Sequence, residues 1–180
     1  LGWRGVVLHM RSCGGLINRH KQFYHAGFYR DIEYFMDALL PSRENSGSIF
    51  LAGVSLGGSQ VVHYLAKGQA RNHVSAAAFI STPLDLRASA DFMSSGLNRI
   101  YVLKFRNSLL KKYHLKADLI QNPEMAARLS RARTFWDLDN DATAPMHGFD
   151  NAVHYYREMS AKKVLKDIPV PSVYLAARDD

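Results

Sequence analysis

The strongest indication of chemistry lies in residues 53–57, which read Gly-Val-Ser-Leu-Gly. The apolar run at 48–52 predicts a buried strand before this stretch, and apolar residues at helical spacing predict a helix directly after it. A serine in Gly-x-Ser-x-Gly between a strand and a helix is typical of a nucleophile elbow. We therefore expect Ser55 to be a nucleophile on a strained turn. The positions beside this turn would leave no room for a Cβ, which accounts for Gly53 and Gly57, and the Leu56 N–H would face a developing oxyanion.

Two other interpretations of this stretch compete with a nucleophile. The serine could be a structural residue in a glycine-rich turn between a strand and a helix. The glycines could instead cradle a phosphate, but no Lys-Ser or Lys-Thr pair follows them, as such a loop requires. The additional Gly58 favours close packing of the following helix, and the nucleophile is the interpretation we adopt.

An activated serine needs a histidine as base and an acid that orients it, and in elbow hydrolases the chain order is serine, acid, histidine. Asp180, just after the last expected strand, is our candidate for the acid, with Asp179 as the alternative; both could also simply solvate a loop. All eight histidines precede these acids and so break the expected order; His147, which precedes a helix at a glycine, is the least unsuitable substitute for the base. We expect the catalytic histidine and the second oxyanion donor outside this chain, which resembles the interior of a longer protein.

Other reactive residues carry weaker indications. Cys13 lies beside Arg11 in a glycine-rich loop and could be a nucleophile, but Ser55 has the stronger context, so we expect Cys13 to be structural. The aspartates at 137, 139 and 141 imitate the start of a calcium loop, but Ala142 replaces the required glycine and Gly148 the bidentate glutamate. The sequence thus predicts neither a metal site nor a cofactor.

Composition limits the class of protein. The 180 residues are 47% hydrophobic, enough for one domain with a sizeable core, and no run is long enough to span a membrane. The single cysteine excludes an internal disulfide framework and favours a reducing, cytoplasmic location; membrane anchoring by segments outside the chain stays open. The net charge of +7 comes without a nucleic-acid motif or a single basic stripe, so a solvated basic surface is expected.

Strand-like and helix-like segments alternate along the chain. Strands are expected at residues 5–10, 48–52, 76–80 and 172–177, and helices at 28–40, after Ser55 and at 149–159. This order predicts an α/β fold with a mostly parallel sheet covered by helices on both faces. The Cys13 loop, Ser55, the Thr82 loop and Asp180 would then meet at the carboxyl ends of the strands, where such sheets hold their active sites.

The alternation is interrupted in the middle of the chain. We expect residues 1–87 and 136–180 to form two parts of one core domain, and residues 88–135 to be a helical cap inserted between them. The cap combines apolar and basic residues, which could place it on a membrane surface or over a lipid-filled cleft. A cap packed on the domain with a solvated outer face is the interpretation we adopt.

Several motifs together resemble the YheT-like α/β-hydrolases. They are Gly5-Val6-Val7-Leu8-His9-Met10-Arg11-Ser12-Cys13-Gly14-Gly15, Asn18-Arg19, Tyr24-His25-Ala26-Gly27, Gly53-Val54-Ser55-Leu56-Gly57-Gly58, Ser81-Thr82-Pro83-Leu84-Asp85-Leu86, Thr143-Ala144-Pro145-Met146-His147-Gly148-Phe149, Tyr155-Tyr156 and Ala177-Arg178-Asp179-Asp180. The resemblance implies an α/β-hydrolase fold with a helical cap and hydrolysis of short- or medium-chain acyl esters or lipids. It also implies Ser55 as nucleophile, Asp180 as acid and Leu56 as an oxyanion contributor. The chain departs from the family at Ser12, where the family has glycine, and it lacks the oxyanion His-Gly motif and the terminal catalytic histidine.

The leading hypothesis is therefore a serine esterase or lipase-like hydrolase that uses no cofactor and acts on a small-molecule or lipid ester. A thioesterase or acyltransferase of the same fold would share the acyl-enzyme intermediate. A non-catalytic binding or scaffold protein that keeps the fold is the hypothesis from a different class.

Overall fold

Three of the expected apolar runs form the sheet of the computed structural model, which describes residues 2–42 and 47–177. The strands are β1 (Ile49–Val54), β2 (Val74–Ile80) and β3 (Ser172–Leu175). They pair in the order β1-β2-β3, and both pairs are parallel. Each strand lies within two residues of its predicted position, because short apolar runs bounded by turn residues favour buried parallel strands.

The segment at residues 5–10, predicted to be a strand, is irregular in the structure. Val6 and Val7 are exposed, and β1 is paired only with β2 within the described residues. A strand is defined by pairing with a neighbour, and no described strand pairs with this segment, so its apolar pattern alone does not make it one.

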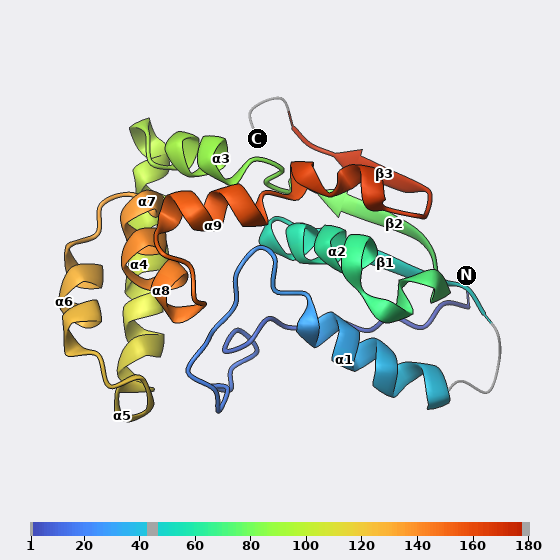
Figure 1. Ribbon diagram of the computed structural model, residues 1–180, viewed down its shortest axis with the longest axis horizontal. Coiled ribbons are helices and arrows are strands. Elements are labelled where there is room, and N and C mark those ends of the chain that lie inside the picture. Colours follow the sequence, from blue (N-terminus) through green and yellow to red (C-terminus); the bar gives the residue numbers. More distant parts are fainter. Residues whose placement is uncertain (1, 43–46, 178–180) are drawn as a thin grey trace.

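The main core lies on one face of the sheet. Helix α2 (Leu56–Lys67) packs against β1 and β2, and α1 (Arg30–Leu39) packs against α2 (Figure 1). Val62, Tyr64 and Leu65 of α2 are fully buried there. Helix α1 follows the expected amphipathic pattern, burying Ile32 and Met36.

The opposite face of the sheet is open within the described part of the chain. Phe50 and Val54 of β1 alternate with more buried residues and are about half exposed, and all four residues of β3 are exposed. The described helices thus cover one face, whereas the sequence predicted cover on both.

Helices fill the long connection from β2 to β3. They are α3 (Leu86–Met93), α4 (Arg99–His114), α5 (Ala117–Ile120), α6 (Pro123–Arg131), α7 (Phe135–Leu138), α8 (Ala144–Met146) and α9 (Ala152–Met159), with a π-helix, η4 (Asp139–Thr143), between α7 and α8. Short 3₁₀ turns occupy Leu40–Ser42, Gln69–His73, Gly96–Asn98, Ala161–Lys163 and Leu165–Asp167.

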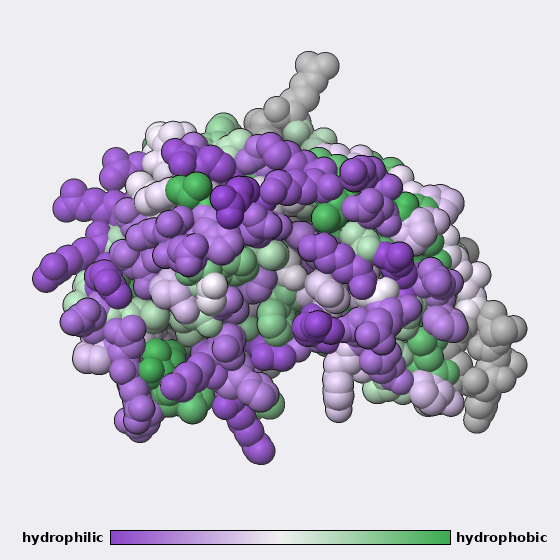
Figure 2. Space-filling model, in the orientation of Figure 1, coloured by the Kyte–Doolittle hydropathy of each residue, from purple (hydrophilic) through white to green (hydrophobic). Residues whose placement is uncertain are grey.

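We call α4, α5, α6 and α7 together the helical block. It lies at one end of the molecule, at the left in Figure 1, and has its own core around Val102, Tyr113 and Leu129. The loop before α1 runs between the block and α1 (Figure 1). Hydrophilic side chains dominate the face shown in Figure 2, and hydrophobic ones occur there in separate small groups. Such a surface suits the net charge of +7.

Candidate active site

Ser55 occupies the turn that joins β1 to α2. Its backbone has φ 51° and ψ −128°, a combination that residues with a side chain rarely adopt. The Ser55 N–H donates to the carbonyl of Ile80 at 2.8 Å, and the Ser55 carbonyl accepts from Gly58 N–H at 2.9 Å. Ser55 is exposed at the carboxyl end of β1. Strain of this kind costs about 1–3 kcal/mol and persists only where the surroundings enforce it.

Close packing of backbone around the turn enforces this conformation. A Cβ on Gly53 would lie 2.5 Å from Gly58 Cα and 2.7 Å from Gly57 O, so β1 and α2 touch through main chain alone. A Cβ on Gly58 would lie 1.8 Å from Thr82 Oγ1. These two glycines let the strand, the helix and the Thr82 loop meet.

The expectation that Gly57 leaves no room for a Cβ is wrong. The nearest atom to a Cβ built at Gly57 is Met10 Cε at 3.5 Å, an ordinary van der Waals contact. The steric requirement falls on Gly53, where a Cβ would meet main chain, and on Gly58, where it would meet Thr82.

Three hydrogen bonds hold the loop after β2 beside the elbow. The Tyr174 hydroxyl donates to Thr82 O at 2.9 Å, and the Ser59 hydroxyl donates to Pro83 O at 3.1 Å. The Ser81 N–H donates to Leu175 O at 2.8 Å. Thr82 itself is 2% exposed. The carboxyl ends of the three strands therefore hold the Ser55 turn in place, as expected from the sheet topology.

Leu56 is the first residue of α2, directly after Ser55. The N–H groups of a helix's first turn have no partner within the helix and carry the positive end of its dipole. The Leu56 side chain packs against a second core cluster with Ala26, Ala144 and Tyr155. Packing thus fixes the direction of the first N–H groups of α2 beside the exposed Ser55.

Three enclosed histidines lie on α2 or near it, and each forms a hydrogen bond with main chain. His25 Nδ1 accepts from Gly27 N–H at 3.2 Å, His63 Nε2 donates to Met159 O at 3.1 Å, and His147 Nδ1 donates to Thr143 O at 2.8 Å. Burial, then the neighbouring His147 and His63, lower the pKa of His25 to about 3. Burial also lowers the pKa of His63 and of His147.

His147 packs edge-on against His25, with ring centroids 4.7 Å apart. Its Nε2 is buried and has no hydrogen-bond partner among the described residues. Within the same residues, no histidine nitrogen hydrogen-bonds to the Ser55 hydroxyl. The structure does not bring His147, the substitute base considered from sequence, into hydrogen-bond contact with Ser55. Asp180 and Asp179 lie outside the described residues.

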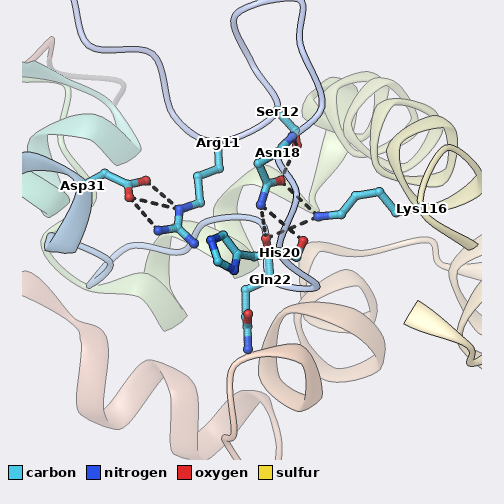
Figure 3. Close-up of polar contacts among 7 residues, drawn as sticks. All are labelled: Arg11, Ser12, Asn18, His20, Gln22, Asp31 and Lys116. Carbon is cyan, nitrogen blue, oxygen red and sulfur yellow. Dashed lines mark hydrogen bonds and ion pairs between the residues drawn. The ribbon is translucent and has the colours of Figure 1, made fainter. Parts of the chain in front are cut away.

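A polar cluster that sequence reasoning missed anchors the loop before α1 (Figure 3). At its start, the Arg11 guanidinium donates to both carboxylate oxygens of Asp31 on α1, at 2.7–3.0 Å, and lies 4.5 Å above the ring of Phe28. Ser12 Oγ donates to Asn18 Oδ1 at 2.6 Å, and Asn18 Nδ2 donates to the carbonyls of His20 and Gln22 at 3.2 and 2.9 Å. These bonds fix the fold of the loop internally.

Lys116, between α4 and α5, joins the helical block to this loop (Figure 3). Its ammonium donates to Asn18 Oδ1 at 3.0 Å and to the carbonyls of Lys21 and Gln22 at 3.2 and 3.4 Å. It also lies 4.0 Å above the ring of Phe23, and the residue is 4% exposed. Burial, then the nearby Arg11, lower the Lys116 pKa. This contact is recognised only in the structure, from the burial of the lysine and its three oxygen partners. The sequence gives no indication of it.

The remaining reactive residues have other roles. Cys13 is an exposed free thiol whose Sγ lies 3.3 Å from Lys112 Nζ. Asp137 caps α7 together with Thr134, and Asp139 accepts from the Tyr156 hydroxyl at 2.7 Å. Burial raises the pKa of Asp139 to about 6. Among residues 2–42 and 47–177, no group of three or more His, Cys, Asp or Glu side chains is placed to hold a metal.

Comparison with known proteins shows to which proteins this chain is related. The chain is 35% identical over 182 residues to the protein named "Putative esterase YheT" from Escherichia coli, covering 99% of this chain and 53% of that protein. The chain is homologous to the YheT-like α/β-hydrolases. It is also 33% identical over 189 residues to a monoacylglycerol lipase of Saccharomyces cerevisiae and 28% identical over 189 residues to a mouse phospholipase ABHD3.

The chain spans about half the length of these YheT-like relatives: 53% of the bacterial, 41% of the yeast and 44% of the mouse protein. No protein-family model matches the chain, and no solved structure does so. No helix in the described parts of the chain has the length and hydrophobicity needed to cross a bilayer. The homology confirms the resemblance found in the motifs and the mixed α/β class, with esterases and lipases as relatives.

Proposed function

We propose that this chain carries the nucleophile of a serine hydrolase that cleaves carboxylic esters. The observation that supports this most directly is the Ser55 backbone, held at φ 51° and exposed where β1 meets α2. Contacts through the main chain of Gly53 and Gly58 maintain this conformation, although the strain costs stability. A serine with only a structural role would gain nothing from this strained backbone.

In this proposal the Ser55 hydroxyl attacks the ester carbonyl while a histidine base takes its proton. The Leu56 N–H, at the N-terminus of α2, donates to the oxyanion of the tetrahedral intermediate. The base then protonates the departing alcohol, leaving an acyl group on Ser55. Water, activated by the same base, hydrolyses this ester and restores the serine. Asp180 would orient the base, and the reaction needs no cofactor.

None of the three enclosed histidines is placed to act as the base. His25, His63 and His147 are enclosed and have lowered pKa values, and each uses one ring nitrogen in a hydrogen bond to main chain. A base must reach the serine hydroxyl within hydrogen-bond distance. We therefore assign the base to a histidine beyond this chain.

The names of the relatives support a class of substrate. Their names describe an esterase, a monoacylglycerol lipase and a phospholipase. We propose short- or medium-chain acyl esters, including lipid esters, as substrates. We further propose that residues 1–87 and 136–180 form an α/β-hydrolase core, and that residues 88–135 form a cap over its substrate. The single free cysteine favours a cytoplasmic location.

The test measures hydrolysis of a short acyl ester, a medium-chain acyl ester, a monoacylglycerol and an acyl thioester by the protein as its gene encodes it. Each reaction is run with and without an acceptor alcohol. Ser55→Ala should abolish turnover, whereas the control Ser75→Ala, at an exposed position of β2, should not change it. Preference for the thioester would favour a thioesterase, and transfer to the alcohol an acyltransferase. Turnover that survives in Ser55→Ala would refute Ser55 as nucleophile.

A further inference from the structure

The exposed side of α4 carries an unusual concentration of positive charge. The helix contains five Lys and Arg residues and no acidic residue. Arg99, Leu103 and Arg106 follow one another at intervals of four and three, which places them on one side of the helix. Lys112 and Lys116, in contrast, contact the loop before α1. The basic residues of α4 and Lys116 thus divide between contacts to this loop and a face toward solvent.

Three arginines surround an open cavity on this face. The cavity has a volume of about 290 Å³ and is lined by Arg99, Leu103, Arg106 and Arg133. Arg133 lies between α6 and α7, so two separate segments contribute guanidinium groups. Like charges gathered in this way repel one another unless an anion lies between them.

No carboxylate in the described parts of the chain forms an ion pair with these three arginines. The nearest acid by sequence, Asp137, directs its carboxylate to the main-chain N–H groups of Arg133 and Thr134. Among the residues that the structure describes, Arg106 makes only long contacts of 3.4 Å, to Ala132 O and to Asn107 Oδ1. The guanidinium groups therefore retain most of their capacity to bind an external anion.

Large apolar side chains lie among these charges. Leu97, directly before α4, is 87% exposed, Ile100 is 67% exposed and Leu103 is 45% exposed. Exposed apolar residues beside Arg and Lys are typical of surfaces that contact a membrane interface, where the apolar groups enter the lipid and the cations meet its phosphates. A nucleic-acid site would gain nothing from Leu97 and Ile100, which carry no charge and cannot stack on bases.

We propose that this face, consisting of Leu97, Ile100, Leu103 and the arginines 99, 106 and 133, docks the protein onto an anionic phospholipid surface. A lipid phosphate occupies the cavity between the three guanidinium groups, and the apolar side chains insert beside it. The purpose of this docking, delivery of lipid esters to the Ser55 site, rests on the proposed function, but the binding itself does not require Ser55.

The test is flotation of the protein, as its gene encodes it, with vesicles of phosphatidylcholine alone or with phosphatidylglycerol added. The triple variant Arg99→Gln, Arg106→Gln, Arg133→Gln should bind the anionic vesicles roughly a hundredfold more weakly, since each basic residue near such a surface contributes roughly a factor of five. The matched control Arg4→Gln, Arg19→Gln, Arg157→Gln removes the same charge from exposed positions outside the helical block and should lose far less. Ile100→Ser with Leu103→Ser should weaken binding without changing charge.

Two further measurements separate this proposal from the hydrolase proposal. Ser55→Ala should float as wild type does, and the triple arginine variant should hydrolyse a water-soluble ester at the wild-type rate, which also shows that it is folded. Equal flotation of wild type and the triple variant, or an equal loss in the triple variant and its matched control, would overturn the docking site. Binding to duplex DNA without flotation on anionic vesicles would overturn it in favour of a nucleic-acid site.

Discussion

The glycines of the elbow should differ sharply in their tolerance of a single methyl group. At Gly53 a Cβ would lie 2.5 Å from Gly58 Cα and 2.7 Å from Gly58 N, and both of these atoms belong to main chain. At Gly58 the nearest atoms are Thr82 Oγ1 at 1.8 Å and Thr82 Cβ at 2.9 Å, which belong to a side chain. At Gly57 the nearest atom is 3.5 Å away.

These distances set the expected magnitudes. Overpacking a well-packed site costs about 1–3 kcal/mol, and more where neither side can move. Gly53→Ala must displace α2 from β1, so we expect a loss of about 3 kcal/mol or more in the free energy of unfolding. Gly58→Ala should cost about 2–3 kcal/mol. Gly57→Ala fits its space and replaces glycine in the first turn of α2, so it should be neutral or stabilise by up to about 1 kcal/mol.

The assay is urea denaturation of the three alanine variants, with thermal melting as a second measure. For a protein of this size, 1 kcal/mol corresponds to a change of roughly 2–4 °C in Tm. The double variant Gly58→Ala with Thr82→Ala removes the 1.8 Å contact and should recover part of the loss, whereas Thr82→Ala should recover nothing when combined with Gly53→Ala. If Gly57→Ala were the most damaging of the three, or if Thr82→Ala failed to rescue Gly58→Ala, the proposed packing at the elbow would be refuted.

Three other substitutions test the surroundings of the site. Lys116→Met removes the buried ammonium that holds the loop to the helical block and should lower the free energy of unfolding by roughly 2 kcal/mol. The control Lys111→Met, at an exposed position of α4, should change it by no more than about 0.5 kcal/mol. Equal losses of the two variants in urea denaturation would contradict the role of Lys116 as an anchor. The pKa of Asp139 is raised to about 6 from 3.8, so its stabilising contribution is complete below about pH 4 and is lost as the pH rises through 6. The stability of wild type relative to Asp139→Asn should therefore fall over this range, and a difference that stays constant with pH would contradict the raised pKa. His147→Gln should keep kcat/KM within about tenfold of wild type, because His147 is hydrogen-bonded to Thr143 O and not to Ser55. Loss of a general base costs roughly 10²–10⁴-fold, so a loss of that size would make His147 the base.

Much of the fold follows from local pattern. The runs at β1, β2 and β3 are short, apolar and bounded by turn residues, and α1, α2 and α9 lie where apolar residues at helical spacing predict helices. Pro41 and Pro123 mark a helix end and a helix start, as their fixed φ and missing N–H require. These signals are local, and local signals can be recognised in sequence.

The features that sequence did not predict depend on residues far apart in the chain. Residues 5–10 have a strand pattern, but strand formation requires a pairing partner that the described residues do not provide. Lys116 belongs to a run of basic residues that suggests a solvated surface, yet it is buried against carbonyl groups nearly 100 positions earlier. The distinction between Gly57 and Gly58 depends on Thr82, a contact that the motif alone does not reveal.

The most direct test of Ser55 as an activated nucleophile is labelling with a fluorophosphonate probe, which reacts covalently with activated serines. Wild-type protein, as its gene encodes it, should be labelled, and the Ser55→Ala variant should lose that label while Ser75→Ala keeps it. Folded wild-type protein that stays unlabelled, or a Ser55→Ala variant labelled as strongly as wild type, would contradict the proposal that Ser55 attacks an acyl ester.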